Sequence, residues 1–387
     1  MGAAAGGGGS LYERWKAAIY LGLVSSTCST IVSQLSAARI GRDAAVDWMS
    51  VAAIPGRDWA LTSHPTAAAI SIGIAFHQWA DFSWALFFFG VMGRWTARLH
   101  PHTLALVALP WAVFTSAFEW LVLVPLFPFW QPIFTLQQPY WIGFLVHFTS
   151  ASMYSFYAWL RHPSRPALKG RRFLLAWAAG AATGLVALSG LALFASHDRE
   201  IPWLGREAER DQTFIRHMST HHEQGIQLAS MAAERAVNPH LRALAKLMAA
   251  SQTGEKRLFD HYWLSWFGSP MQICSARERA AMPGLLDDAQ IDQLREVSPA
   301  EFDSLFVSTM TIHHAGAVKM ADDEFRNGSD LRLRAMAHAI RHEQQGEIAL
   351  MNCANGGTAV VLAIQNMFSD NANKPDRELP GSASCQR

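Results

Sequence analysis

The chain has 387 residues, of which 50% are hydrophobic and only 16% are charged, and its formal net charge is +1. Soluble globular domains carry about 25% charged residues, and a nearly neutral chain without a Lys/Arg stripe excludes a strongly basic nucleic-acid-binding protein. Twelve of the 15 tryptophans precede residue 197, whereas 10 of the 16 histidines and 10 of the 14 methionines lie at or after it. This asymmetry excludes a single soluble enzyme domain.

The first half is predicted to be a transmembrane domain over residues 16–196, after a flexible start at 1–15. Its long apolar stretches each have about the 20 residues needed to cross a hydrocarbon core about 30 Å thick. These stretches are 16–36, 67–91, 103–127, 139–160 and 172–195. A cleavable signal peptide does not fit the first stretch, because no small-residue cleavage site stands out and four more stretches follow.

The short loops predict the orientation of this domain. The loops after the second and fourth stretches are rich in arginine, whereas the loop from Phe127 to Gln138 contains no Lys or Arg. The positive-inside rule then places the N-terminus in the cytoplasm and the chain after about residue 196 on the periplasmic or extracellular side. The loop 37–66 runs against this, because its three arginines are only partly offset by three aspartates.

Four ionisable residues fall inside the apolar stretches, where they are costly. His77 and Asp81 are four residues apart and share a helix face, and Glu119 and His147 are candidates to meet them. Two interpretations stay open. The four residues form either a polar cluster that fixes helix packing, or an ion path, proton path or buried metal site.

The second half is an internal repeat with a shift of 92 residues. The first copy contributes Asp211, Phe214, Met218, His221, His222, Gln252 and Glu255, which fall on Asp303, Phe306, Met310, His313, His314, Gln344 and Glu347. Each copy is predicted to form two helices, over 206–266 and 299–353, with turns at Asn238-Pro239 and Asn327-Gly328. The connector 267–298 contains a short helical run near 287–296, and the tail 368–387 is predicted to be disordered.

Two such hairpins make an antiparallel four-helix bundle over 197–367, so the whole chain is predicted to be all-α. In such bundles, facing side chains build metal sites. Helical spacing puts Met218 beside His221 and His222, and Met310 beside His313 and His314. The further candidate ligands on nearby turns are Met320, Met231, His217, His338 and His342.

Thioether and imidazole together suit copper, above all Cu(I), whereas zinc seldom uses methionine. Neither copy contains the Glu-x-x-His motif of di-iron bundles. We expect a group of carboxamide and carboxylate side chains to accept the free N–H of the imidazoles and orient them. This group is Gln252, Glu255, Gln344 and Glu347. The alternative is that the methionines fill the core and the histidines are simply hydrogen-bonded.

At these residues the chain resembles the bacterial family called domain of unknown function 305, a ferritin-like four-helix domain. The second copy carries the family pattern in the segments Met310 to His314 and Gln344 to Met351. The first copy departs from it at Leu228, Lys256 and Phe259. The resemblance covers about 205–355 and does not reach the membrane half. It implies an exported or membrane-tethered domain, with copper binding or copper tolerance as its role.

Three functional hypotheses follow. The preferred one is a multi-pass membrane protein whose extracytoplasmic bundle binds Cu(I) or Cu(II) and buffers it or passes it to a partner protein, without enzymatic turnover. The second is a metal transporter or metal-dependent oxidase that uses the intramembrane residues. The third is a structural docking subunit of a membrane complex. The four cysteines are too scattered for a disulfide scaffold. Cys274 and Cys353 could pair if the C-terminal half is extracytoplasmic, but the sequence does not supply the geometry of such a bond.

Overall fold

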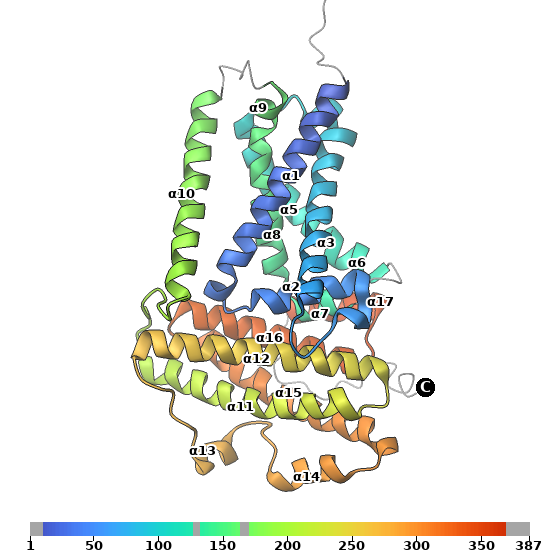
Figure 1. Ribbon diagram of the computed structural model, residues 1–387, viewed down its shortest axis with the longest axis vertical. Helices are drawn as coiled ribbons and strands as arrows, with labels where there is room; N and C mark the ends of the chain where they lie inside the picture. Colours follow the sequence, from blue (N-terminus) through green and yellow to red (C-terminus); the bar gives the residue numbers. More distant parts are fainter. Residues whose placement is uncertain (1–10, 127–131, 163–169, 369–387) are drawn as a thin grey trace, which may run out of the picture. The chain divides into compact units, whose positions relative to one another are not determined.

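The computed structural model, shown in Figure 1, describes residues 11–126, 132–162 and 170–368. Within these ranges the protein is all-α and contains no strand. The chain divides into two compact units. The apolar unit comprises Met1–Gln34, Ala75–Phe118 and Trp141–Ser189, and the bundle unit comprises Leu35–Ile74, Glu119–Tyr140 and Gly190–Arg387.

The apolar unit contains most of the helical residues of the five apolar stretches. The helices are α1 (Leu11–Ser36), α3 (Ala67–Leu86) with η3 (Phe87–Val91), α4 (Gly93–Thr96), α5 (Pro101–Phe118), α8 (Tyr140–Ser152) with η5 (Met153–Phe156) and α9 (Tyr157–Arg161), and α10 (Arg171–Ala195). Aromatic rings fill its core, where Phe89 stacks on Tyr157 with ring centroids 3.9 Å apart. Helix α1 begins at Leu11, inside the start predicted to be flexible, and residues 1–10 lie outside the described ranges.

Three helices of the described residues are long and apolar enough to cross a membrane: Leu11–Ile40, Pro101–Leu126 and Arg171–Ala195. The stretches 67–91 and 139–160 are also helical, but π- and 3-10 turns interrupt them. Five spans therefore remain a prediction. No residue of α10 is buried by protein, as expected for an apolar helix that lies in lipid.

The bundle unit is organised around four long helices: α11 (Ala208–Arg235), α12 (Pro239–Phe267), α15 (Pro299–Asn327) and α16 (Leu331–Met351). These match the two predicted hairpins in position. Helix α11 packs on α12, α15 on α16, and α11 on α15 (Figure 1). The connector forms α14 (Asp288–Glu296) where a short helix was expected and α13 (Ala276–Ala281) where none was.

Two aspartates at equivalent repeat positions link the two copies of the repeat by hydrogen bonds. Asp211 accepts hydrogen bonds from the backbone N–H groups of Ser329 and Asp330 at 2.9 and 3.0 Å. Asp303, 92 residues later, accepts from those of Val237 and Asn238 at 2.9 and 2.8 Å. Each aspartate thus fixes the turn between the two helices of the other copy. This exchange explains why the sequence repeats an aspartate at the start of each hairpin.

Segments from the first half of the chain complete the bundle unit. They are η1 (Ala37–Ile40), α2 (Ala44–Gly56), η2 (Arg57–Ala60), η4 (Glu119–Leu123), α6 (Val124–Leu126) and α7 (Ile133–Gln137), joined by the C-terminal α17 (Gly356–Phe368). Figure 1 shows α2, α7 and α17 along one side of the four helices, with α13 and α14 on the other. Met49, Ile133 and Leu136 are fully buried in the bundle core. The units therefore differ from the predicted domains, which meet at residue 196, because these loops bury apolar side chains against the bundle.

Two glycines at equivalent repeat positions permit this packing. A Cβ on Gly346 would lie 2.1 Å from the backbone oxygen of Leu136, and one on Gly254 would lie 2.8 Å from Cβ of Asp43. Any side chain at these positions would push the added segments away from α12 and α16.

The pairing of Cys274 with Cys353, which the sequence left open, does not occur. Cys274 is a free buried thiol, whereas Cys353 is disulfide-bonded. Cys274 lies against α11, 3.6 Å from the carbonyl oxygen of Arg216, while Cys353 lies two residues after the end of α16. The tail predicted to be disordered lies outside the described ranges except for its first residue, Phe368, which ends α17.

Candidate metal centre

The duplicated histidine pairs lie at the centre of the bundle. His221 and His222 on α11 and His313 and His314 on α15 are all fully buried. The rings of His221 and His313 face each other, with centroids 3.9 Å apart and planes 35° from parallel. Gly225 makes room for this pair, because a Cβ there would lie 2.9 Å from Cε1 of His313.

Hydrogen bonds to carbonyl groups fix the protonation of this facing pair. Nε2 of His221 lies 3.2 Å from the oxygen of Pro283, and Nε2 of His313 lies 3.2 Å from the backbone oxygen of His221. A carbonyl oxygen only accepts, so both Nε2 atoms donate and each Nδ1 keeps its lone pair. Burial lowers the pKa of His221 to about 3 and that of His313 well below its usual value, so both rings are neutral.

The second histidine of each pair binds a carboxyl group. Nε2 of His222 lies 2.7 Å from Glu255, and Nε2 of His314 lies 2.8 Å from Glu347. Burial raises the pKa of each glutamate to about 8 and lowers that of His222 to about 4 and His314 to about 3. Both imidazoles are therefore neutral at pH 7, and burial favours the protonated form of both carboxyl groups.

The Nδ1 atoms of all four histidines are buried and have no hydrogen-bond partner among the described residues. Buried polar atoms are nearly always paired, so four unpaired ring nitrogens in one core need an explanation. A neutral imidazole with one nitrogen held by an acceptor and a lone pair on the other is the usual arrangement of a metal-binding histidine. These residues therefore fit a metal ion through the chemistry of their donor atoms.

The two glutamines behave differently from the two glutamates. Both amide atoms of Gln252 and the amide oxygen of Gln344 are buried without a partner. Gln252 lies beside Gly225, where a Cβ would come within 2.0 Å of its Oε1. No hydrogen bond from either amide to an imidazole is present in the described part of the chain.

A carboxyl cluster that sequence reasoning missed extends this polar core toward α2 and α7. Glu343 pairs with Arg42 at 3.3 Å, and Nε2 of Gln137 lies 3.3 Å from both Glu343 and Glu347. Arg42 also pairs with Asp47. Burial raises the pKa of Glu343 to about 8. A sequence signal was available, because the three arginines of the loop 37–66 ran against the orientation predicted by the positive-inside rule.

The predicted methionine ligands lie in apolar surroundings. Met218 is fully buried in a cluster with Phe214 and Phe259, and Met310 is fully buried in the other core cluster, which contains Phe302 and Phe306. Met231 and Met320 pack partly buried against these clusters.

Two other predicted histidine ligands lie on α16. His342 is buried with Nε2 unpaired, and the ring centroid of His338 lies 5.1 Å from that of Phe325. Burial lowers the pKa of His338 to about 4 and that of His342 to about 3.

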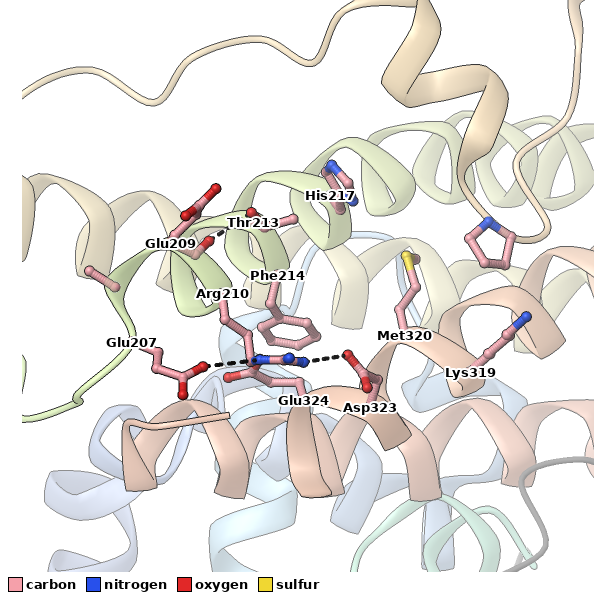
Figure 2. A pocket seen from close by; sticks show the side chains of 12 residues that line it. Glu207, Glu209, Arg210, Thr213, Phe214, His217, Lys319, Met320, Asp323 and Glu324 are labelled. Atoms are coloured by element: carbon pink, nitrogen blue, oxygen red, sulfur yellow. Dashed lines mark hydrogen bonds and ion pairs between the residues drawn. The ribbon is translucent and has the colours of Figure 1, made fainter. Parts of the chain in front are cut away.

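A cavity of about 740 Å³ opens between α11 and α15 (Figure 2). Arg210 crosses it, pairing with Asp323 at 3.1 Å and Glu207 at 3.5 Å. His217 and Met320 line the same cavity, so His217 faces this opening instead of joining His221. Glu209 and Glu324 add two more carboxyl groups to its wall, against a single further cation, Lys319.

The structure brings together three of the four intramembrane candidates. Asp81 is 2% exposed, and its two oxygens lie 3.7 Å from Nε2 of His77 and 3.7 Å from Nδ1 of His147. Ser29 donates a hydrogen bond to Asp81, and the hydroxyl of Thr115 lies 3.2 Å from Nδ1 of His147. The fourth candidate, Glu119, begins η4 and belongs to the bundle unit.

Residues 211–354 match the sequence profile of the family Domain of unknown function (DUF305), which confirms the resemblance expected for the C-terminal half. Similar solved structures include a DUF305 fragment from Deinococcus radiodurans, with 27% identity, a TM-score of 0.35, and coverage of 39% of this chain and 95% of that one. A DUF305 protein from Streptomyces coelicolor has 26% identity and a TM-score of 0.34, with coverage of 37% and 88%. CopM in the Cu(I)-bound form has 28% identity and a TM-score of 0.32, with coverage of 36% and 91%. No curated protein matches this chain.

Proposed function

We propose that this chain is a membrane-anchored copper-binding protein that holds the ion among the four core imidazoles. The observation that carries the proposal is the set of buried, neutral histidines with unpaired Nδ1 atoms. Among divalent first-row metals, copper binds nitrogen ligands most tightly, and it exceeds zinc. His221 and His313 are the first ligands we assign, because their Nε2 atoms donate to carbonyl groups and their rings face each other.

The rest of the core supports this assignment. Glu255 and Glu347 orient His222 and His314, as a partner on the second ring nitrogen of a metal-bound imidazole does. The methionines serve as apolar packing around the imidazoles in this proposal, and they screen the ion from water. The bundle stores or transfers the ion, which requires no catalytic turnover.

Membrane anchoring and an extracytoplasmic bundle are part of the same proposal. Three apolar helices supply the anchor, and the arginine-rich loops favour a cytoplasmic N-terminus. The disulfide at Cys353 supports this placement, because disulfides persist in oxidising compartments.

Replacing His221 and His313 together by alanine should remove the copper that survives dialysis of the full chain in detergent. The measurement is copper per chain by mass spectrometry, after loading under reducing and under oxidising conditions. His240→Ala is the matched control, because this residue lies at the partly exposed start of α12. Unchanged copper in the double variant would contradict the assignment. A wild-type chain that binds no metal but co-purifies with membrane proteins would favour the docking role.

A second candidate function is metal or proton movement through the apolar unit, and the His77–Asp81–His147 cluster favours it. Two imidazoles on one buried carboxylate form a site that can bind a cation or pass a proton. Vesicles containing the protein should then show copper-dependent flux that His77→Ala abolishes. The matched control is His64→Ala, outside the predicted spans. Equal flux in wild type and His77→Ala would leave the cluster as a packing device.

A further inference from the structure

Three side chains outside the histidine core converge beside α11. His217 lies on α11, Cys274 in the connector and Glu278 on α13, and one ligand atom from each lies within 4.8 Å of the other two. Among the described residues this is the only such group of His, Cys, Asp and Glu side chains. Two of the three come from the connector between the repeats, so the repeat pattern gave no sign of it.

The carboxylate of this group is fixed in place by its own helix cap. The backbone N–H and the hydroxyl of Ser275 both donate to Oε2 of Glu278 at 2.7 Å. These bonds hold the pKa of Glu278 at about 2, so the group is ionised. The other oxygen, Oε1, is left facing Nε2 of His217 at 3.7 Å.

The positively charged side chain of Arg216 already occupies this site. Nη2 of Arg216 is 3.0 Å from Oε1 of Glu278 and 4.0 Å from Sγ of Cys274. The guanidinium thus sits between the carboxylate and the thiol, where positive charge is favourable. Its Nε donates to the backbone oxygen of Gln272 at 3.2 Å, so the guanidinium must give up both contacts for an ion to take its place.

We propose that Cys274, His217 and Glu278 form a second metal site, which takes a thiolate-preferring d¹⁰ ion, Cu(I) or Zn(II). Thiolates select these two ions, and zinc sites commonly combine cysteine, histidine and carboxylate ligands. Binding breaks the S–H bond of Cys274, forms a metal–sulfur bond and releases the proton to solvent, with no change in oxidation state. Arg216 then moves off Glu278 as the ion enters.

The surroundings make this site exchangeable, in contrast to the buried core. The side chains of His217 and Glu278 are 26% and 32% exposed, and His217 also lines the carboxyl-rich cavity of Figure 2. An entering ion therefore meets His217 and Glu278 from solvent, whereas Cys274 is only 4% exposed. The site stands on its own residues and does not rest on copper binding by the four core histidines.

The test is titration of the full chain in detergent with Cu(I) and, separately, with Zn(II). Cu(I) binding is followed by thiolate-to-metal charge-transfer absorption, and Zn(II) binding by competition with a chromophoric chelator. Cys274→Ser should lose the absorption band and one equivalent of the preferred ion. Cys28→Ser is the matched control because Cys28 is the other free thiol of the described residues, and it should bind as wild type does.

His217→Ala provides a second variant at a partly exposed position, where the fold tolerates truncation, and it should weaken binding at least tenfold. The His221→Ala/His313→Ala variant should keep the thiolate band, which separates this site from the core. If Cys274→Ser binds both ions as wild type does, or if Cys28→Ser loses the same equivalent, the proposed site is overturned.

Discussion

Replacing Arg42 with methionine should destabilise the protein by about 3–5 kcal/mol, the usual cost of removing one partner of a buried ion pair. The Arg42 side chain is 5% exposed and pairs with Asp47 and with Glu343, which is 3% exposed. Without the guanidinium, these carboxyl groups have no compensating cation in the described part of the chain. The measurement is the melting temperature of the full chain in detergent.

The loss of stability in the Arg42→Met variant should be greater at high pH than at low pH. Burial raises the pKa of Glu255, Glu343 and Glu347 to about 8. A group whose pKa is higher in the folded than in the unfolded protein stabilises the fold fully at pH values below its unfolded-state pKa. This stabilisation is lost as the pH rises through its folded-state pKa. Arg42 lowers the pKa of Glu255 and Glu343, so its removal should cost more at pH 8 than at pH 5.

Arg257→Met is the matched control for this prediction. Arg257 also pairs with an aspartate, Asp43, but its side chain is 68% exposed. Exposed ion pairs contribute about 0–1 kcal/mol, so the melting temperature should barely change. Equal effects of the Arg42 and Arg257 substitutions, or an Arg42 effect independent of pH, would contradict a buried carboxyl cluster held by Arg42.

Asp211→Ala should destabilise the bundle by about 3 kcal/mol, because hydrogen bonds to a charged group contribute about 1.5–3 kcal/mol and buried donors left unpaired add to the cost. The carboxylate of Asp211 is fully buried. It accepts from the indole of Trp203 at 2.8 Å and from three groups of Ser329 and Asp330. The measurement is again the shift in melting temperature.

The repeat supplies the control for this second substitution. Asp303 occupies the equivalent position but is only partly buried, and it accepts two backbone hydrogen bonds. Asp303→Ala should therefore cost about 1 kcal/mol, the typical contribution of a helix-end cap. A larger effect of Asp303→Ala than of Asp211→Ala would show that the two caps do not depend on burial as described.

The repeat made much of the bundle predictable. A shift of 92 residues located both hairpins, and the duplicated Gln-x-x-Glu motif indicated the partners of His222 and His314. Periodicity could not separate methionine as ligand from methionine as packing, because both uses need the same helix face. The structure places Met218 and Met310 among phenylalanines.

The part that sequence reasoning missed depends on contacts distant in the sequence. Arg42 meets Glu343 across 301 residues and Gln137 meets Glu347 across 210. No local pattern encodes such pairs, and hydropathy assigned both loops to the membrane half. Only the glycines Gly254 and Gly346, which are equivalent in the repeat, mark in the sequence the helix faces against which these loops pack.

The central claim is that copper lies among the four core histidines, and anomalous scattering at the copper edge from crystals of the copper-loaded full chain tests it most directly. The account predicts a peak inside the bundle, at bonding distance from Nδ1 of His221 and His313. A peak only at His217, Cys274 and Glu278, or at exposed methionines, would contradict the core site. So would copper-loaded crystals with no peak in the bundle.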